Sequence, residues 1–85
     1  MDGDLPHILV IDDDNRLREL LRQFLNKNGF WVSVACDAGD ARERLKGMTF
    51  DLLVLDRMMP GESGLSLVAD IRKSSMVPIL MLTAM

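Results

Sequence analysis

The stretch that decides the fold is His7-Ile8-Leu9-Val10-Ile11-Asp12-Asp13-Asp14, a short apolar run that stops at three consecutive carboxylates. Short runs of branched apolar residues are typical of strands that are buried on both faces of a sheet. A second run, residues 52–55, has the same character and stops at the carboxylate of Asp56. The two runs therefore predict two buried strands, each followed by an acidic position.

The segment after the first run has the periodicity of an amphipathic helix. Five apolar side chains recur at the spacing of one helical face, which we expect to pack on the sheet: Leu17, Leu20, Leu21, Phe24 and Leu25. Five polar side chains are expected on the solvent side: Arg16, Arg18, Glu19, Arg22 and Gln23. The pattern predicts a helix that follows the first strand and ends near Gly29.

The remaining segments continue the alternation. Residues 31–35 resemble a less buried edge strand, and Asp37 is placed to cap a short helix that ends near Gly47. A third helix follows the Pro60 loop, and Pro78 precedes a fourth strand at residues 79–83. The order βαβαβαβ predicts an α/β fold with a parallel sheet, right-handed crossovers and helices on both faces.

Composition limits the classes of function. The chain has 85 residues, 48% hydrophobic and 27% charged, which is enough for one small domain. A net charge of −3 excludes a basic nucleic-acid surface in this segment, and the single cysteine, Cys36, excludes an internal disulfide or a cysteine-rich zinc site. There is no apolar stretch of membrane-spanning length, and no secretory leader pattern at the start. We expect a cytoplasmic protein without membrane contact.

Polar groups fall where the predicted strands end: Asp12 and Asp13 after the first, Asp56 at the third and Thr83 at the fourth. In a parallel sheet these carboxyl ends meet at one edge, which is where such folds place their sites. Clustered carboxylates repel one another and raise each other's pKa unless a cation neutralises them. The pattern predicts a hard metal ion, for which Mg²⁺ is the natural candidate.

Four phrases make the sequence resemble the receiver (CheY-like) domain of bacterial two-component response regulators: residues 8–14, 51–56, 59–64 and 77–84. The resemblance implies a flavodoxin-like sheet with strand order 2-1-3-4. Within the family, the similarity is greatest to OmpR-type regulators in the stretch from Pro60 to Leu67 and at Asp14, Arg16, Leu17, Arg18, Leu20 and Leu21. It also implies a transcriptional role, through a DNA-binding output domain that this chain does not contain.

The resemblance assigns a role to each candidate residue. Asp56 would accept phosphate from a cognate histidine kinase and lie next to the metal, while Asp13 and the backbone carbonyl of Met58 would coordinate Mg²⁺. Asp12 would act mainly through a metal-bound water. The hydroxyl of Thr83 would respond to the phosphoryl group. The protein would then be a signalling phosphoacceptor and not an enzyme.

Two alternatives remain open at this stage. A haloacid-dehalogenase-like phosphohydrolase would use Asp12 and Asp14 as its acidic pair, but it leaves Asp56 unexplained and puts Arg16 where Thr or Val is needed. A receiver-like module could also act by dimerisation or other protein contacts without phosphate. Asp14 has a simpler interpretation as a carboxylate favoured at a helix N-terminus.

The resembling family has a fifth strand, which ends in a lysine, and flanking helices beyond the fourth strand. No lysine of this sequence follows the fourth strand: Lys27, Lys46 and Lys73 all precede it. We therefore expect residues 1–85 to be the N-terminal part of a receiver domain. Without its neighbour, the apolar fourth strand would leave an open edge, and we expect it to self-associate.

Overall fold

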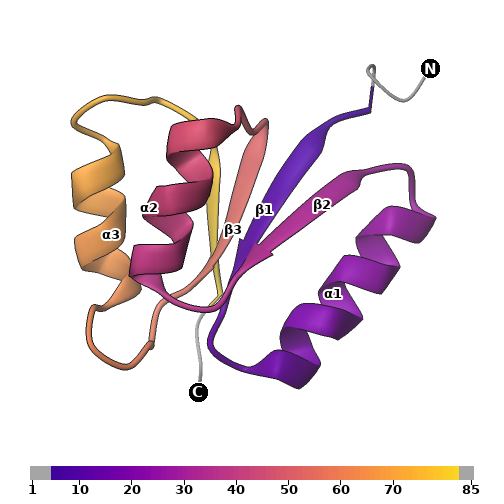
Figure 1. Cartoon of the computed structure of the whole chain (residues 1–85), viewed down its shortest axis with the longest axis horizontal. Helices are drawn as coiled ribbons and strands as arrows, with labels where there is room; N and C mark the ends of the chain where they lie inside the picture. The colour runs from indigo at the N-terminus through magenta and orange to yellow at the C-terminus, as the bar shows by residue number, and fades with distance from the viewer. Residues whose placement is uncertain (1–4, 83–85) are drawn as a thin grey trace.

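The computed structural model describes residues 5–82, which form one parallel sheet flanked by helices (Figure 1). The elements follow one another in this order: β1 (His7–Ile11), α1 (Asn15–Lys27), β2 (Trp31–Ala35), α2 (Ala38–Gly47), β3 (Leu52–Asp56), α3 (Gly64–Ile71) and β4 (Ile79–Leu82). The strands are hydrogen-bonded in the order β2-β1-β3-β4, and every pair is parallel. The predicted alternation of elements and the predicted strand order are confirmed.

The register of the strands decides which residues meet at the edge of the sheet formed by the carboxyl ends of the strands. Ile11 of β1 pairs with Leu55 of β3, and Asp56 pairs with Leu82 of β4. Asp12 follows β1 directly, so it comes to the same carboxyl edge at which Asp56 ends β3. The apolar runs thus align their acidic ends without any contact between the acids themselves.

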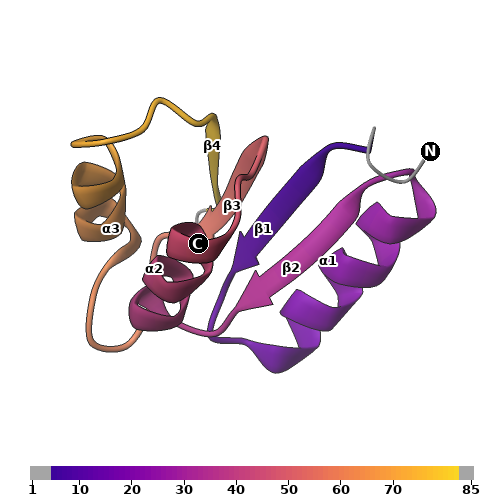
Figure 2. The same cartoon turned by 45° about the horizontal axis from the view of Figure 1, so that its top comes forward.

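Helices α2 and α3 cover one face of the sheet and α1 covers the other (Figures 1 and 2). The face under α2 and α3 holds the larger core, whose buried residues are Leu9, Ile11, Ala35, Ala38, Ala41, Phe50, Leu53, Leu55, Leu67 and Ile71. Strand residues alternate between the two faces, which is why Leu9 and Ile11 belong to this core. This core joins β1, β2 and β3 to both helices, and Ile79 and Met81 of β4 pack against it.

The face under α1 is packed less completely. Its buried cluster consists of Ile8, Val10 and Val54, with Leu21 and Leu25 of α1 only partly buried against it. Within the described part of the chain, α1 has no buried residue. The expectation that its whole apolar stripe faces the sheet is therefore wrong for Leu20 and Phe24, which are 64% and 62% exposed. A single helix that lies on a sheet buries only the side chains along its line of contact, and the apolar side chains beside that line stay exposed.

Each helix begins at a polar residue whose side chain accepts backbone N–H groups. Asp37 accepts the N–H of Asp40 at 2.7 Å, as the sequence predicts, and Ser63 accepts the N–H of Ser66 at 3.2 Å. These bonds satisfy donors that a helix start leaves without partners. None of the helices described between residues 5 and 82 combines the length and the apolarity needed to cross a membrane.

Candidate functional site

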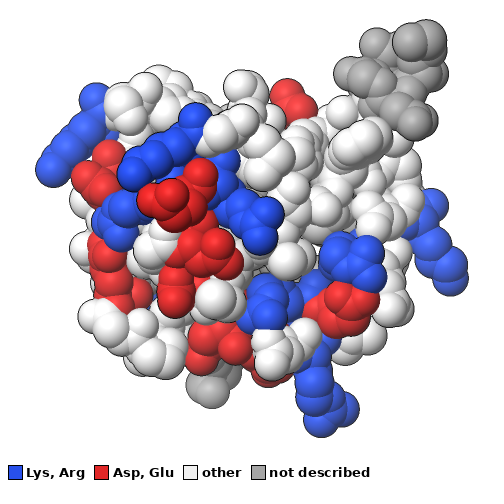
Figure 3. Space-filling model, in the orientation of Figure 1, with Lys and Arg blue, Asp and Glu red and all other residues white. Residues whose placement is uncertain are grey.

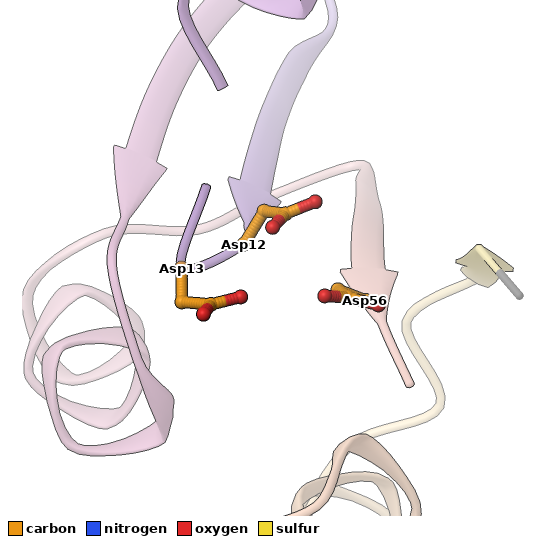
Figure 4. Close-up of side chains that lie close together, drawn as sticks. All are labelled: Asp12, Asp13 and Asp56. Atoms are coloured by element: carbon orange, nitrogen blue, oxygen red, sulfur yellow. The ribbon is translucent and has the colours of Figure 1, made fainter. Parts of the chain in front are cut away.

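Three carboxylates converge at the carboxyl edge of the sheet, as the close-up shows (Figure 4). Asp12 and Asp13 follow β1, Asp56 ends β3, and one oxygen from each lies within 4.8 Å of the others. Asp12 is buried, Asp56 is half-buried and Asp13 is exposed. The site therefore extends from the buried side chain of Asp12 to the exposed side chain of Asp13.

The carboxylate of Asp12 is only half satisfied by the protein. Its Oδ1 accepts the backbone N–H of Asp14 at 2.9 Å, whereas its buried Oδ2 has no hydrogen-bond partner among residues 5–82. Burial raises the pKa of Asp12 above its ordinary value, and the negative charges of Asp56 and Asp13 add to that effect. The hydrogen bond from Asp14 opposes the shift. A buried carboxylate oxygen that has no hydrogen-bond partner in the protein is expected to contact an ion or a water molecule.

Arg18 supports the segment that carries Asp12 and Asp13. Its Nη1 donates to the backbone carbonyl of Asp12 at 2.8 Å, and its Nη2 donates to Asn15. The prediction that Arg18 lies on the solvent side of α1 is wrong, since its side chain is half-buried. Helical periodicity could not find this contact, because it depends on the path of the chain between β1 and α1.

The segment after Asp56 turns back sharply onto the end of β3. Asp56 Oδ1 accepts the N–H of Met58 at 3.1 Å, and the N–H of Gly64 donates to the carbonyl of Arg57 at 2.9 Å. A Cβ atom at Gly64 would lie 2.4 Å from the carbonyl oxygen of Asp56. No side chain fits at that distance, so glycine is required where α3 meets β3.

The donor set fits a hard divalent cation. It offers carboxylate oxygens from Asp12, Asp13 and Asp56, one of them buried and without a partner in the described chain. Mg²⁺ and Ca²⁺ prefer such oxygens, and Mg²⁺ typically keeps several waters beside one or two carboxylates. The exposure of Asp13 leaves the site open to solvent.

The structure brings together the three predicted acids and separates Asp14 from them. Asp14 Oδ1 accepts the N–H groups of Arg16 and Leu17 at 2.9 and 3.2 Å, so Asp14 is the N-cap of α1. Of the acidic pair that the phosphohydrolase alternative needs, Asp12 lies in the cluster but Asp14 is engaged as a helix cap. Thr83, another predicted site residue, lies outside the described residues.

A family model and several known proteins are similar to this chain. Residues 8–85 match the family of the response regulator receiver domain. Protein PetR of Rhodobacter capsulatus is 54% identical over 84 residues, which are 99% of this chain and 35% of PetR. The transcriptional regulatory protein ResD of Bacillus subtilis is 39% identical over 77 residues, covering 91% of this chain and 32% of ResD. The chain thus spans about a third of the length of these curated relatives.

Solved structures agree with this assignment. The chemotaxis response regulator CheY4 of Vibrio cholerae has a TM-score of 0.91 at 30% identity, over 95% of this chain and 70% of that one. The response regulator protein TrrA of Thermotoga maritima, solved in complex with Mg²⁺-BeF, has a TM-score of 0.89 at 36% identity, over 95% and 71%. Both share the CheY-like, flavodoxin-type arrangement. The chain belongs to the response regulator receiver domain family.

Proposed function

We propose that this chain is the phosphoacceptor part of a two-component response regulator, with Asp56 as the residue that is phosphorylated and Mg²⁺ as its cofactor. The observation that carries the proposal is that carboxylate oxygens of Asp12, Asp13 and Asp56 lie within 4.8 Å of one another. In addition, Asp12 Oδ2 is buried and has no hydrogen-bond partner among the described residues. A metal ion at Asp13 and the Met58 carbonyl, with Asp12 nearby, would neutralise this cluster. The similar TrrA structure, a complex with Mg²⁺-BeF, supports the choice of cofactor.

Asp56 is placed to act as the nucleophile. It is half-buried at the end of β3, so its carboxylate is oriented by the Met58 N–H and still open to a donor. A carboxylate oxygen of Asp56 forms the new bond to phosphorus while the bond from phosphorus to the donor breaks. When bound, Mg²⁺ supplies charge neutralisation for the carboxylates and for the transferring phosphoryl oxygens. In-line transfer of this kind needs positioning more than a separate acid or base.

The output of the switch lies beyond the described site. Thr83 follows Leu82, which pairs with Asp56 in the sheet register, and its hydroxyl is the proposed first responder to phosphate. The donor would be a histidine kinase, since receiver domains act with such kinases. Relatives named as transcriptional regulators support a role in transcription. That role would be exerted through a DNA-binding output domain of OmpR type, in a cytoplasmic protein whose receiver domain has residues 1–85 as its N-terminal part.

The decisive experiment incubates the full-length protein with acetyl phosphate and Mg²⁺ and maps added phosphate by mass spectrometry. The expected result is one phosphoryl group on Asp56 that does not form when Mg²⁺ is chelated beforehand. Asp56→Asn removes the acceptor oxygen and is expected to abolish labelling. Label on Asp12 with release of inorganic phosphate would support the phosphohydrolase instead, and no label would support an interaction module that works without phosphate.

Asp14→Asn is the matched control. Asp14 is adjacent to the cluster, but its side chain caps α1, and Asn caps a helix about as well as Asp. This variant is expected to fold and to be labelled like the original protein. Equal loss of label in Asp14→Asn and Asp56→Asn would contradict the assignment of Asp56 as the acceptor.

A further inference from the structure

The guanidinium group of Arg42, on α2, contacts acids from two different elements. Its Nη1 and Nη2 donate to the two carboxylate oxygens of Glu62 at 2.6 and 2.7 Å, and its Nε donates to Asp70 Oδ2 at 2.8 Å. Glu62 belongs to the loop between β3 and α3, residues 57–63, whereas Asp70 is on α3. Figure 3 shows positive and negative side chains intermingled over this part of the surface.

The contact between Arg42 and Glu62 is better defined than an ordinary surface ion pair. Both side chains are about two-thirds covered, whereas those of the pair between Lys46 and Glu43 are 74% and 72% exposed. A bidentate guanidinium fixes both the distance and the orientation of a carboxylate. The Ser66 hydroxyl also donates to Glu62 at 2.9 Å. Chiefly through Arg42, these bonds hold the pKa of Glu62 at about 2, so the carboxylate stays ionised.

The loop held in this way carries part of the proposed site. It begins directly after Asp56, contains Met58, and is closed at its far end by the bond from Gly64 to Arg57. Between these points Gly61 has φ of +86°, a turn geometry that glycine adopts without strain. Glu62 therefore ties the outer part of the loop to α2, an element that contributes none of the three acids.

We propose that Arg42 is a positioning residue for the phosphoacceptor site, which holds the loop at residues 57–63 in place through its bidentate pair with Glu62. The inference rests on the proposed function only for its effect on Mg²⁺ and phosphate. The competing interpretation is that Arg42 merely joins α2 to α3. The two contacts separate these interpretations, because Glu62 lies in the loop and Asp70 lies on the helix.

The first measurement is made on metal-free, full-length protein by amide hydrogen exchange read by NMR. The reporters are the N–H group of Met58, which donates to Asp56 at the start of the loop, and that of Gly64, which donates to Arg57 and closes the loop. Arg42→Gln and Glu62→Gln are expected to speed exchange at both amides several-fold, since local opening becomes easier. Asp70→Asn leaves the loop contact intact and is expected to leave both amides unchanged.

The second measurement is a Mg²⁺ titration followed by the same amide signals. Residues that orient metal ligands typically change metal affinity by about 10-fold or more when they are replaced. Arg42→Gln and Glu62→Gln are each expected to weaken Mg²⁺ binding roughly 10-fold, and the double variant by no more than either one. Arg42→Lys keeps the positive charge but cannot donate two parallel hydrogen bonds to Glu62. Its Mg²⁺ affinity is expected to lie between those of the original protein and Arg42→Gln.

Arg44→Gln serves as the matched control, because Arg44 lies on the same helix and pairs with Asp40 at 3.6 Å on an exposed surface. It is expected to change neither measurement. The proposal is overturned if the loop amides and Mg²⁺ affinity are unchanged in Arg42→Gln, if the two single effects add, or if Asp70→Asn matches Glu62→Gln. Absence of Mg²⁺ binding in the unmodified protein would contradict the proposed function, while the metal-free exchange data would still decide whether Arg42 holds the loop.

Discussion

The two faces of the sheet differ in how completely they are covered. Under α2 and α3, strand residues such as Leu9 and Leu53 are completely buried, and Leu67 of α3 is buried with them. Under α1, three strand residues are buried, while Leu20 and Phe24 of the helix itself point away from the described core. Yet α1 has the more regular apolar stripe. The comparison teaches that amphipathic periodicity shows which side chains of a helix would be buried if other elements packed on them. It does not show how many of those side chains are buried in the folded protein.

The same difference continues at the open edge formed by β4. Ile79 and Met81 pack against the larger cluster, whereas Leu80 is 55% exposed. Leu80 is in register with Val54, which belongs to the smaller cluster under α1. The face with one helix is thus incompletely covered from α1 to the edge strand.

The largest expected effect is a difference between the same substitution on the two faces. Leu67→Ala removes a fully buried side chain from α3 and is expected to lower the free energy of unfolding by about 3 kcal/mol. Leu20→Ala on α1 is expected to change it by less than about 0.5 kcal/mol. Equilibrium urea unfolding measures both.

If Leu67→Ala does not fold, the milder Ile71→Val tests the same face and is expected to cost about 1 kcal/mol. Similar losses for the α1 and α3 variants would show that the two faces are equally well packed in solution, and would remove the basis of the comparison.

The next effect concerns the close contact between α3 and β3. Gly64→Ala places a methyl group against the Asp56 carbonyl and is expected to cost about 2 kcal/mol, because the backbone must shift. Thermal unfolding provides the measurement. In contrast, Gly47→Ala at the end of α2 meets nothing within 4 Å and is expected to be neutral or slightly stabilising. A neutral Gly64→Ala variant would mean that α3 can move away from the edge of the sheet freely.

Asp12→Asn removes a buried negative charge that lies close to Asp13 and Asp56. It is expected to raise the free energy of unfolding of the metal-free protein at neutral pH by about 1 kcal/mol, as the removal of an unfavourable functional-site charge commonly does. The folded state holds a proton on Asp12 more tightly than the unfolded state, since its pKa is raised by burial. Stability of the original protein should therefore fall as pH rises from the ordinary carboxyl range through that raised pKa.

Excess Mg²⁺ should restore this loss in the original protein and have much less effect on Asp12→Asn, as measured by melting temperature across a pH series. A variant whose metal-free stability shows the same pH dependence as the original protein would exclude Asp12 as the source of the effect.

The smallest effect on stability is expected at the β4 edge. Leu80→Lys changes an exposed side chain and should alter the free energy of unfolding by a few tenths of a kcal/mol. Its main consequence is for association: a charged residue on an open strand discourages edge pairing. We expect the 85-residue chain to self-associate in light scattering and Leu80→Lys to do so less. A monomeric original chain at high concentration would rule out pairing through this edge.

Several features of the fold could be predicted from short-range patterns. The run from Ile8 to Ile11 is apolar at every position, so a strand covered on both faces was the consistent interpretation. The Asp37 cap is likewise a local signal, because a short side chain bonds a donor three residues away. The acidic cluster needed one further step, which is that parallel strands share a carboxyl edge.

Other features could not be predicted in this way. Arg18 and Leu20 lie two residues apart on α1, and the sequence pattern places the leucine on the sheet and the arginine in solvent. The structure half-buries Arg18 against the Asp12 carbonyl and leaves Leu20 exposed. The contact of Arg42 with Glu62 joins residues 20 positions apart and depends on where α2 lies relative to the loop.

The sequence alone therefore determined the order of elements, the parallel sheet and the identity of the three site acids, because apolar periodicity and strand ends are local properties of the chain. Only the tertiary structure decided how deeply Asp12 is buried, which oxygen is left without a partner, and which arginines support the two segments that carry the site. Those properties come from the distances between elements that are far apart in the sequence. Periodicity in one element carries no information about the position of another.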